Sequence, residues 1–551
     1  MRTIPEKETL KAAFKSARKD LEEAALIDEV TGMANACGGS IYLGVEGDGT
    51  ITGVYSNSDD PIDENRIAAL VGSMTVPPVP IRVEWMKENG LDVLKLEVSA
   101  SRSIISTMEG KVLRRRLKTD GSPETVPMRP HEMNTRLSDL GRLDLSAAVF
   151  EDASKQDLNP IERQRLRKLI YEQHGEAALL DLDDEELDTA LGLQRNGHPT
   201  LTGLLLIGKE ESLKKFVPTY EAAFQVLEGS SVVINESSNQ PILAVFEDFY
   251  QRFSALNMEE EFDWKLQRIP VPEFSETAFR EAIVNAFAHR DYSRLGRVRV
   301  AFEEEGLTIS STGGFVEDIS WQNLLTAEPR SRNPMLADAL KRIGLAERTG
   351  RGIDRIFEGS IQYGRPLPDY SESSSSIVRL LIPRHKPDRG FMNMLLNYQE
   401  ERSRRIPIYS QLILSVLLQQ HRLTLQEMAS LTNIGETRLR KYAEQLVEDG
   451  MIEASGIGER RSYILSPKVY SSRENLYGSI RQHTADNGSE KMMILQLAQE
   501  MRDGISRKDV CSLIKVSPQK AYRMLQELVE EGKLDVKGQG RGTHYVLTGK
   551  E

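Results

Sequence analysis

The pattern of hydrophobic and polar positions in the last third of the chain occurs twice, and the two copies are offset by 82 residues. Each copy ends with a helical run that stops at a glycine, a short strand, a glycine-rich turn and a second strand, at residues 446–465 and 528–547. The helical spacing of apolar residues predicts further helices upstream. They are expected over residues 413–420, 425–432 and 436–448 in the first copy, and over 492–501, 507–514 and 518–531 in the second.

This order of helices followed by a two-stranded wing resembles winged helix-turn-helix domains, which we expect at residues 389–470 and 471–551. Side chains near the start of a third helix can reach base edges, and wing arginines can reach phosphates. Basic residues occupy such positions in the third helices, at Arg438, Arg440, Lys441, Lys520 and Arg523, and in the wings, at Arg460, Arg461 and Arg541. We therefore expect at least one copy to bind DNA, while dimerisation or spacing remains an alternative role for either copy.

Near the N-terminus, residues 28–54 combine a helix with glycine-rich strands. The helix runs into Ala34-Asn35, a break follows at Gly38-Gly39, and an apolar strand ends at Gly44-Val45 before a turn into a further strand. This string resembles the Schlafen AlbA-like domain. The resemblance covers residues 5–138, continuing through Arg114, Arg115 and Arg116 to His131-Glu132-Met133. It implies an α/β domain that binds nucleic acid.

Some members of the Schlafen family are metal-dependent nucleases, and the resemblance implies a pair of glutamates on a first helix, in the pattern Glu, four residues, Glu-Phe-Lys. Residues 8–15 match this pattern at Glu8, Phe14 and Lys15, but Ala13 stands where the second glutamate belongs. A methyl group cannot hold a metal ion. We therefore expect a domain that has lost catalysis. Nuclease activity with Glu8 and a shifted ligand set, such as Glu46 or Asp48, is the alternative.

The densest basic cluster in the chain is Arg114-Arg115-Arg116 with Lys118. In a strand, Arg114 and Arg116 would lie on one face and Arg115 on the other. These arginines could bind phosphates. A salt-bridged strand edge is the equally open alternative.

Residues 139–270 carry fewer signals and are expected to form a connecting α/β region. A helix is predicted over residues 160–170, and an acidic helix start over 181–188. Residues 200–208 read as an apolar strand or buried segment between turn residues.

Residues 271–388 contain an amphipathic helix that runs into a polar loop. Glu281 and Asn285 are four residues apart, so they share one face of this helix. A carboxylate and an amide placed together could hold a water molecule and a magnesium ion against a phosphate. A hairpin over 298–315 leads to the turn Gly313-Gly314, and Gly350-Arg351-Gly352 precedes another helix, which alone is a weak phosphate-loop signal.

The order of these pieces resembles the ATPase-like module found behind AlbA-like domains in bacterial proteins described as predicted transcriptional regulators or helicase-like proteins. That module resembles a divergent GHKL fold, which implies that Glu281 activates water, Asn285 binds magnesium and the Gly350–Gly352 turn is the phosphate lid. ATP and magnesium are the cofactors implied. Such proteins hold adenine with an aspartate in Asp-x-Gly-x-Gly, whereas this chain has Ser311-Thr312-Gly313-Gly314.

Two alternatives therefore remain open for this module: nucleotide binding, and a retained scaffold in which Glu281 and Asn285 support the fold. His289 lies beside this pair, where it could contact a phosphate or make a structural hydrogen bond. The chain has no Gly-x-x-x-x-Gly-Lys-Ser/Thr loop, so a helicase motor is not expected.

Composition narrows the class of protein further. The formal net charge is −12; residues 391–551 hold 23 basic and 20 acidic residues, against 48 and 63 in the remainder. This acidic balance argues against indiscriminate binding of nucleic acid by the whole surface. No apolar run approaches the length needed to span a bilayer, and no secretory signal is present, so we expect a cytoplasmic protein. Cys37 and Cys511 lie too far apart in the sequence for a disulfide framework.

Together these features predict an α+β multidomain protein, with five domains in the order AlbA-like, connecting region, GHKL-like, winged helix and winged helix. The boundaries are expected at residues 1–138, 139–270, 271–388, 389–470 and 471–551. The leading interpretation is a DNA-binding transcriptional regulator with a nucleotide-sensing module, acting as a homodimer on palindromic sites, with RNA not excluded as a target. The alternatives are a Schlafen-type nuclease serving defence against foreign nucleic acid, and a non-catalytic assembly scaffold.

Overall fold

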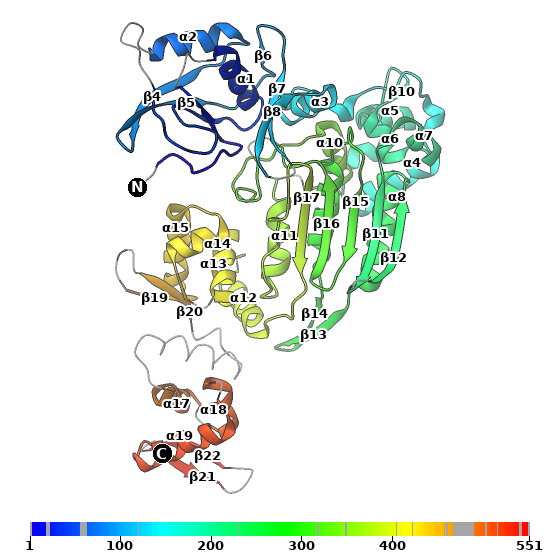
Figure 1. The fold of residues 1–551 in the computed structure, drawn as a ribbon. Helices are drawn as coiled ribbons and strands as arrows, with labels where there is room; N and C mark the ends of the chain where they lie inside the picture. The colour runs from blue at the N-terminus through cyan, green and yellow to red at the C-terminus, as the bar shows by residue number, and fades with distance from the viewer. Residues whose placement is uncertain are drawn as a thin grey trace. The chain divides into compact units, whose positions relative to one another are not determined.

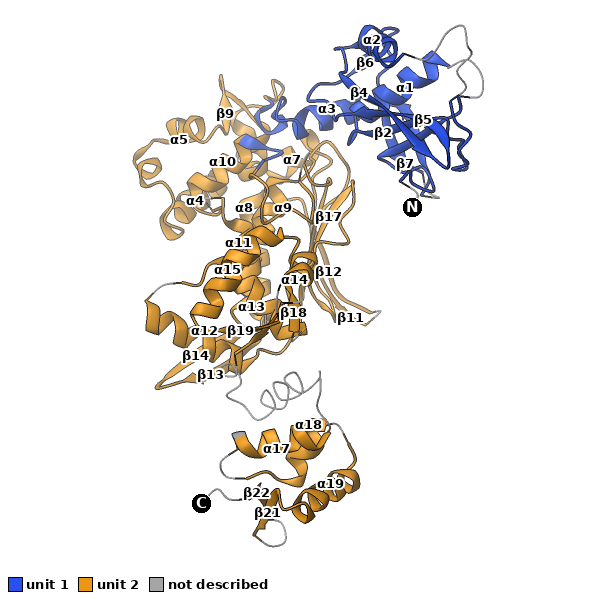
Figure 2. Ribbon diagram, turned by 90° about the vertical axis from the view of Figure 1, so that its left-hand side faces the viewer, with its two compact units in different colours: residues 1–148, 330–334 blue, residues 149–329, 335–551 orange. Residues whose placement is uncertain are grey.

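The computed structural model describes residues 3–548, apart from 18–21, 55–62, 119–120, 230, 317–318, 348–349, 404, 421, 457, 459–460, 467–489, 502–503, 515 and 539–542. The chain divides into two compact units, which are coloured separately in Figure 2. Unit 1 comprises residues 1–148 and 330–334, and unit 2 comprises 149–329 and 335–551. No helix among the described residues is long and apolar enough to cross a membrane.

Unit 1 is built on a four-stranded sheet in the order β1-β2-β5-β4 (Figure 1). Its strands are β1 (Ala12–Lys15), β2 (Gly39–Leu43), β4 (Ile81–Glu88) and β5 (Leu91–Val98). Two further pairs are β3 (Thr75–Val76) with β6 (Ser106–Thr107), and β7 (Leu113–Leu117) with β8 (Pro123–Pro127). The helices are α1 (Glu23–Ala34), α2 (Glu64–Met74) and α3 (Pro130–Asp139).

Residues 8–15, which the Schlafen resemblance assigned to a first helix, contain strand β1 instead. β1 pairs in parallel with β2, and Ala12, Ala13 and Phe14 are all buried. Ala12 and Phe14 belong to one hydrophobic cluster and Ala13 to another, so successive side chains enter opposite cores as in a buried strand. The prediction of a helix was wrong because the periodicity of a short apolar run does not separate the two structures.

The larger part of unit 2 surrounds a five-stranded sheet in the order β12-β11-β15-β16-β17. Its strands are β11 (Ala222–Glu228), β12 (Ser231–Ser238), β15 (Val298–Phe302), β16 (Gly306–Thr312) and β17 (Ile377–Pro383). β11 and β15 pair in parallel, and the other neighbours are antiparallel. The sheet thus takes strands from both sides of the boundary predicted at residue 270, and the five-domain division itself stays a prediction.

Helices of unit 2 lie on one side of this sheet, where α8, α9 and α11 are seen together in Figure 2. The helices up to residue 361 are α4 (Pro160–Glu172), α5 (Asp184–Ala190), α6 (Leu201–Ile207), α7 (Glu210–Phe216), α8 (Ile242–Leu256), α9 (Glu276–Ala288), α10 (Pro334–Ile343) and α11 (Gly352–Ile361). The short antiparallel pairs are β9 (Gln194–Arg195) with β10 (His198–Pro199), and β13 (Glu259–Trp264) with β14 (Gln267–Pro272).

Aromatic side chains join these helices to the sheet. The rings of Phe253 on α8 and Phe279 on α9 are stacked with their centroids 4.0 Å apart. Phe302 of β15 packs against Phe253, and Phe224 of β11 against Phe249. Such rings bury large apolar areas, so this contact holds α9 firmly against the sheet.

Helix α6 replaces the strand that was one of the two structures expected for residues 200–208. All seven residues of α6 are buried, as the other alternative, a buried segment, required. The Thr200 hydroxyl accepts a hydrogen bond from the backbone N–H of Gly203 at 3.1 Å and so caps the helix. The sequence pattern of a continuous apolar run is the same for a buried strand and for a buried helix. In this segment the Thr200 cap favours the helix.

Residues 389–465 form a helical region with a three-stranded antiparallel sheet in the order β18-β20-β19. Its elements are α12 (Arg389–Arg402), α13 (Ile408–Gln420), β18 (Arg422–Thr424), α14 (Leu425–Thr432), α15 (Glu436–Glu448), β19 (Ile452–Ser455) and β20 (Ser462–Leu465). Its buried residues are continuous with the core of the sheet described above.

The elements of the C-terminal segment repeat this arrangement. They are α17 (Glu490–Glu500), α18 (Arg507–Ile514), α19 (Pro518–Glu530), β21 (Leu534–Lys537) and β22 (His544–Leu547), with a hydrophobic cluster of their own. The pairs α14/α18, α15/α19, β19/β21 and β20/β22 are each offset by 82 residues. Even the pairing of Leu423 with Tyr463 recurs as a bridge between Ile505 and Tyr545. The predicted repeat is therefore present element by element. Residues 408–465 are called the first repeat below, and residues 490–547 the second.

Candidate functional site

Helix α15 of the first repeat carries an exposed basic face. Leu439, Ala443 and Leu446 are buried and define the inner side of the helix. Arg438, Arg440 and Lys441 lie between these positions, and all three side chains are exposed. The three cations, which will be called the α15 cations, are the side chains that the sequence predicted to contact DNA.

The α15 cations have no carboxylate partner among the residues that the structure describes. Arg438 instead rests on Tyr409 of α13: its Nη1 atom donates to the Tyr409 hydroxyl at 3.1 Å, and its guanidinium carbon lies 5.3 Å from the ring centroid. The ring orients the guanidinium without neutralising its charge. Arg461 at the start of β20 differs, because its Nη2 atom pairs with Glu444 at 2.8 Å.

Helix α19 of the second repeat presents a different charge pattern. The ammonium group of Lys520 pairs with Glu490 of α17 at 2.8 Å, and Arg523 lies 3.8 Å from Glu527 one turn along the helix. Both predicted contact residues are therefore accompanied by a carboxylate. Exposed pairs of this kind contribute little stability, but they reduce the local positive potential. Arg460 and Arg541, predicted for the wings, lie outside the described residues.

The three consecutive arginines of β7 are all paired with carboxylates within unit 1. Arg114 and Arg116 bind Glu132 and Glu124, each at 2.9 Å. Arg115 is buried on the other face of the strand, as the alternation predicted, and binds Glu29. Its Nη2 atom also donates to the backbone oxygens of Thr9 and Ala12 at 3.0 and 3.1 Å. A buried guanidinium bonded in this way supports the interior of the unit. Arg115 therefore cannot contact a phosphate, and only Arg114 and Arg116 of this cluster could make that contact.

The acidic side chains considered for a nuclease site have other partners. The Oε1 atom of Glu8 accepts a hydrogen bond from the backbone N–H of Phe14 at 2.7 Å. Glu46 accepts from the hydroxyls of Ser16 and Thr52 at 2.9 and 2.8 Å. Among the described residues, no three His, Cys, Asp or Glu side chains are grouped so that they could hold a metal ion. These acids do not fit a divalent-metal site.

Glu281 of α9 is buried against the first turn of α11. The Oε1 atom of Glu281 lies 3.4 Å from Nη1 of Arg355, and Arg355 also binds Glu347. Burial raises the pKa of the Glu281 carboxyl above its ordinary value, and the positive charge of Arg355 opposes that shift. Arg355 and Glu347 were not found from the sequence, since neither lies at a spacing that relates it to Glu281.

Gly352 is the residue of the predicted phosphate lid that meets Glu281. A Cβ atom at Gly352 would lie 2.8 Å from Oε2 of Glu281 and 3.7 Å from Nδ2 of Asn285. The structure therefore brings together Glu281, Asn285 and Gly352, as the resemblance implied. A side chain at Gly352 would require the Glu281 carboxylate to shift. His289 caps the C-terminus of α9, and its backbone N–H donates to the backbone oxygen of Asn285 at 3.0 Å.

The glycines after β16 are explained in a similar way. Gly313 has a φ of +103°, and its N–H donates to the Ser376 oxygen at 2.8 Å. A Cβ atom at Gly314 would lie 2.8 Å from the backbone oxygens of Ser374 and Ser375. The Ser311 hydroxyl, which stands where the adenine-binding aspartate would be, donates to the Ala286 oxygen. These contacts supply no carboxylate for adenine, and ATP binding with magnesium at Asn285 stays a prediction. Gly350 has a φ of +76° in the turn before α11.

Arg290 is a buried residue whose role the sequence did not indicate. Its guanidinium donates to backbone oxygens of Thr219, Asp291 and Gly296, the last at 2.6 Å. Burial lowers the pKa of this guanidinium, while the nearby Tyr292 opposes the shift. The polar run after α9 read as an exposed loop, and only the tertiary structure shows that Arg290 ties this loop to the start of β11.

Three segments of the chain match models of protein families. Residues 7–122 match the family described as Schlafen, AlbA_2, and residues 296–381 match the family described as putative ATP-dependent DNA helicase recG C-terminal. Residues 136–223 match a domain of unknown function, DUF8451. The resemblances to a Schlafen AlbA-like domain and to the ATPase-like module behind it are thereby confirmed.

Comparison with individual proteins adds less. Among curated proteins, none matches the chain. A solved structure, the DIP2311 protein from Corynebacterium diphtheriae, is 21% identical, and the match covers 98% of this chain and 95% of that one with a TM-score of 0.47. At that TM-score the likeness carries no argument about this chain.

Proposed function

We propose that the chain is a DNA-binding transcriptional regulator whose main contact with DNA is made by helix α15. The observation that carries the proposal is the exposed set of α15 cations without a carboxylate partner among the described residues. Three cations on the exposed side of one helix create a local positive potential on a chain whose formal net charge is −12. Such a surface attracts the phosphate backbone while the acidic remainder discourages binding elsewhere.

The elements around α15 support a winged-helix reading of the first repeat. α14 and α15 are joined by a short turn in which Asn433 has a left-handed φ of +57°, as in a helix-turn-helix. β19 and β20 follow as an antiparallel pair in the position of a wing. In this class of fold the second helix of the pair lies in the major groove and its first residues contact base edges. Arg438, Arg440 and Lys441 lie in the first two turns of that helix.

Preorganisation also supports α15 as the contact helix. A long basic side chain loses conformational entropy when it binds, and a contact that already orients it reduces that loss. The stacking of Arg438 on Tyr409 is such a contact. The matches to the Schlafen AlbA_2 family and to the C-terminal family of a putative DNA helicase also point to nucleic acid. A homodimer on a palindromic site remains part of the proposal, with the two α15 helices at two half-sites.

The proposal is tested by fluorescence anisotropy of the full chain with a labelled DNA duplex of mixed sequence. Each neutralised phosphate contributes about 0.9 to the slope of log affinity against log salt, so the three cations of one α15 helix predict roughly 40-fold weaker binding between about 50 and 200 mM salt, and the six of a dimer predict roughly 2,000-fold. Single-stranded DNA and RNA of the same sequence serve as comparison ligands. No binding to any of them at the lower salt, or an affinity that does not change with salt, would contradict the proposal.

A further inference from the structure

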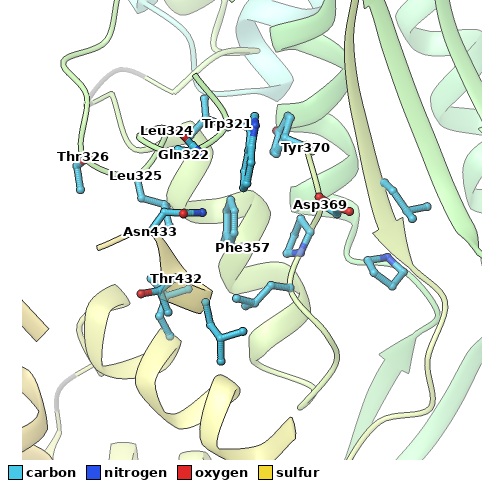
Figure 3. Close-up of a pocket in the computed structure, with 16 residues that line it drawn as sticks. Trp321, Gln322, Leu324, Leu325, Thr326, Phe357, Asp369, Tyr370, Thr432 and Asn433 are labelled. Carbon is cyan, nitrogen blue, oxygen red and sulfur yellow. The ribbon is translucent and has the colours of Figure 1, made fainter. Parts of the chain in front are cut away.

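A cavity of about 400 Å³ lies in unit 2 where the five-stranded sheet meets the first repeat. The sheet side contributes residues from the loop 321–326, from α11 and from the segment 367–370. The repeat contributes Leu412 of α13 and the last residues of α14, Leu431, Thr432 and Asn433. Figure 3 labels side chains of both groups, among them Trp321, Phe357 and Tyr370 of the sheet side and Thr432 and Asn433 of the repeat. The volume is within the range of small-molecule sites.

Three aromatic side chains dominate one side of the cavity. Trp321, Phe357 and Tyr370 lie close to one another in Figure 3. Phe357 and Tyr370 are buried, whereas Trp321 is 40% exposed although its indole is one of the largest side chains in the chain. The cavity is separate from the predicted nucleotide site at Glu281. Glu281 meets α11 at Gly352, at the start of the helix, whereas the cavity is lined by Phe357, further along it. Aromatic faces in this arrangement accept flat rings and cations.

The polar groups of the cavity show which charge it accepts. Asp369 is the charged residue of the lining, which contains no Lys, Arg or His. Its carboxylate accepts hydrogen bonds from the N–H and the hydroxyl of Ser371, at 2.7 and 2.9 Å, and it has no cationic partner among the described residues. Tyr370 is only 8% exposed. Its hydroxyl has no hydrogen-bond partner within the described part of the chain, so it is available to a ligand.

We propose that this cavity binds a hydrophobic organic cation that carries a planar aromatic ring. The ring stacks against Trp321 and Phe357, the positive charge is placed near Asp369, and the Tyr370 hydroxyl hydrogen-bonds to a polar atom of the ligand. An anion such as a nucleotide is disfavoured, because no basic side chain in the lining would neutralise its phosphates. The site therefore differs in position and charge from the nucleotide site predicted near Glu281.

The position of the cavity links the ligand to helix α15. Asn433 ends α14 in a left-handed conformation, and α15 begins after Gly435. A ligand that fills the cavity contacts the turn before the helix that carries the α15 cations. A ligand can shift a conformational equilibrium of the protein only if it binds one conformation more tightly than the other. The turn before α15 is the place where such a preference would change the position of that helix. This second step rests on the proposed function, whereas ligand binding does not.

Ligand binding is tested through the fluorescence of Trp321 in the full chain. The protein has three tryptophans, so Trp85→Phe and Trp264→Phe leave Trp321 as the sole indole reporter. Three probes with the same two-ring size differ in charge: N-methylquinolinium, neutral quinoline and naphthalene-1-sulfonate. The cation is expected to quench Trp321 with an affinity at least about 10-fold above that of quinoline, and the sulfonate at the same concentrations is expected not to quench. Equal affinity for the anion, or no quenching by any probe, overturns the proposal.

Asp369→Asn supplies the matched variant, because the asparagine Oδ1 atom can still accept from the Ser371 N–H while its NH2 group can donate to the Ser371 hydroxyl. The variant is expected to lose about 10-fold in affinity for the cation and to bind quinoline within about 2-fold of the parent. An equal loss for both probes would show that the carboxylate only shapes the cavity, and an unchanged cation affinity would remove its role; either result overturns the proposed charge preference.

The link to α15 is tested by DNA anisotropy with and without saturating N-methylquinolinium. The expected result is a shift in DNA affinity of at least about 3-fold in the parent, and in Asp369→Asn a shift that needs about 10-fold more probe; the same concentration dependence in both would indicate direct binding of the probe to DNA. Quenching without a shift keeps the ligand site but overturns the link. A chain that does not bind DNA overturns the proposed function and leaves the fluorescence result standing.

Discussion

The two C-terminal repeats have the same elements at an offset of 82 residues but differ in surface charge. At equivalent positions, Arg438 corresponds to Lys520 and Lys441 to Arg523. The residues around them differ more: Ile408 and Gln445 of the first repeat correspond to Glu490 and Glu527 of the second. Those two glutamates are the ones that pair with Lys520 and Arg523. The repeated fold keeps its core, and under the proposed function we expect the capacity of each copy to bind DNA to depend on a few carboxylates near the basic residues.

The largest effect is expected from removing the α15 cations. Arg438→Ala, Arg440→Ala and Lys441→Ala together should weaken DNA binding about 100-fold, since each lost cation costs roughly 1 kcal/mol or more of contact energy. Anisotropy measures the affinity, and a thermal melt shows whether the variant keeps its fold. If a folded variant lost less than about 5-fold in DNA affinity, the main contact with DNA would have to be made by another surface.

A smaller effect is expected from the equivalent cations of the second repeat. Lys520→Ala with Arg523→Ala should weaken binding by less than about 5-fold, because the neighbouring carboxylates already reduce the potential around them. The same anisotropy assay applies. A loss as large as that of the α15 variant would show that both repeats contact DNA equally and would remove the distinction between them.

Exchanging one carboxylate between the repeats sharpens the comparison. Gln445→Glu places on α15 the acid that Glu527 supplies on α19, four residues after Lys441, and should weaken DNA binding about 2- to 3-fold. Gln445 is exposed, so the fold should not change. The reverse change, Glu527→Gln, should strengthen binding by no more than about 2-fold. Stronger binding by Gln445→Glu, or weaker binding by Glu527→Gln, would contradict an electrostatic origin of the difference.

The least effect on DNA affinity, less than about 2-fold, is expected from Glu281→Gln in the sheet region. Burial raises the pKa of this carboxyl, so the folded state keeps its proton to a higher pH than the unfolded chain does. The contribution of this retained proton to the free energy of unfolding is fully present below the ordinary pKa of 4.5. It is lost as the pH rises through the pKa of the folded state. The difference between the melting temperature of the variant and that of the wild type should therefore rise in favour of the variant between about pH 5 and pH 8.

Glu228→Gln, which changes an exposed glutamate, is the matched control for that pH series. Its melting temperature should follow that of the wild type at every pH. If Glu281→Gln behaves as this control does, burial does not control the ionisation of Glu281.

The repeat could be predicted because it rests on local signals. Apolar spacing places α14 at 425–432 and α15 at 436–448, and the structure has both helices with those bounds. The partners of the basic residues could not be predicted in the same way. Glu490 reaches Lys520 only after α17 packs beside α19, and a sequence shows that Lys520 is basic without showing which acid it meets.

Tertiary burial decided the two regions where local patterns failed. The strand β1 was assigned to a helix through the Schlafen resemblance, and the short run Ala12, Ala13 and Phe14 has no periodicity that could have corrected it. Arg115 lies in the cluster for which phosphate binding and a salt-bridged strand edge were equally open, and it is buried against Glu29. Glu281, Asn285 and Gly352 were grouped through a family resemblance, and the structure places them together. The ion pair with Arg355 required the fold, because Arg355 is on a different helix.

Photo-crosslinking to DNA that contains 5-iodouracil tests the central claim most directly, because this base crosslinks to aromatic side chains that contact it. Tyr409 and Tyr442 lie on the first repeat beside the α15 cations, while the exposed Tyr522 is on α19 of the second. Peptide mapping of the crosslinked full chain should find the DNA on Tyr409 or Tyr442. Crosslinks at Tyr522 without crosslinks in the first repeat would contradict the account.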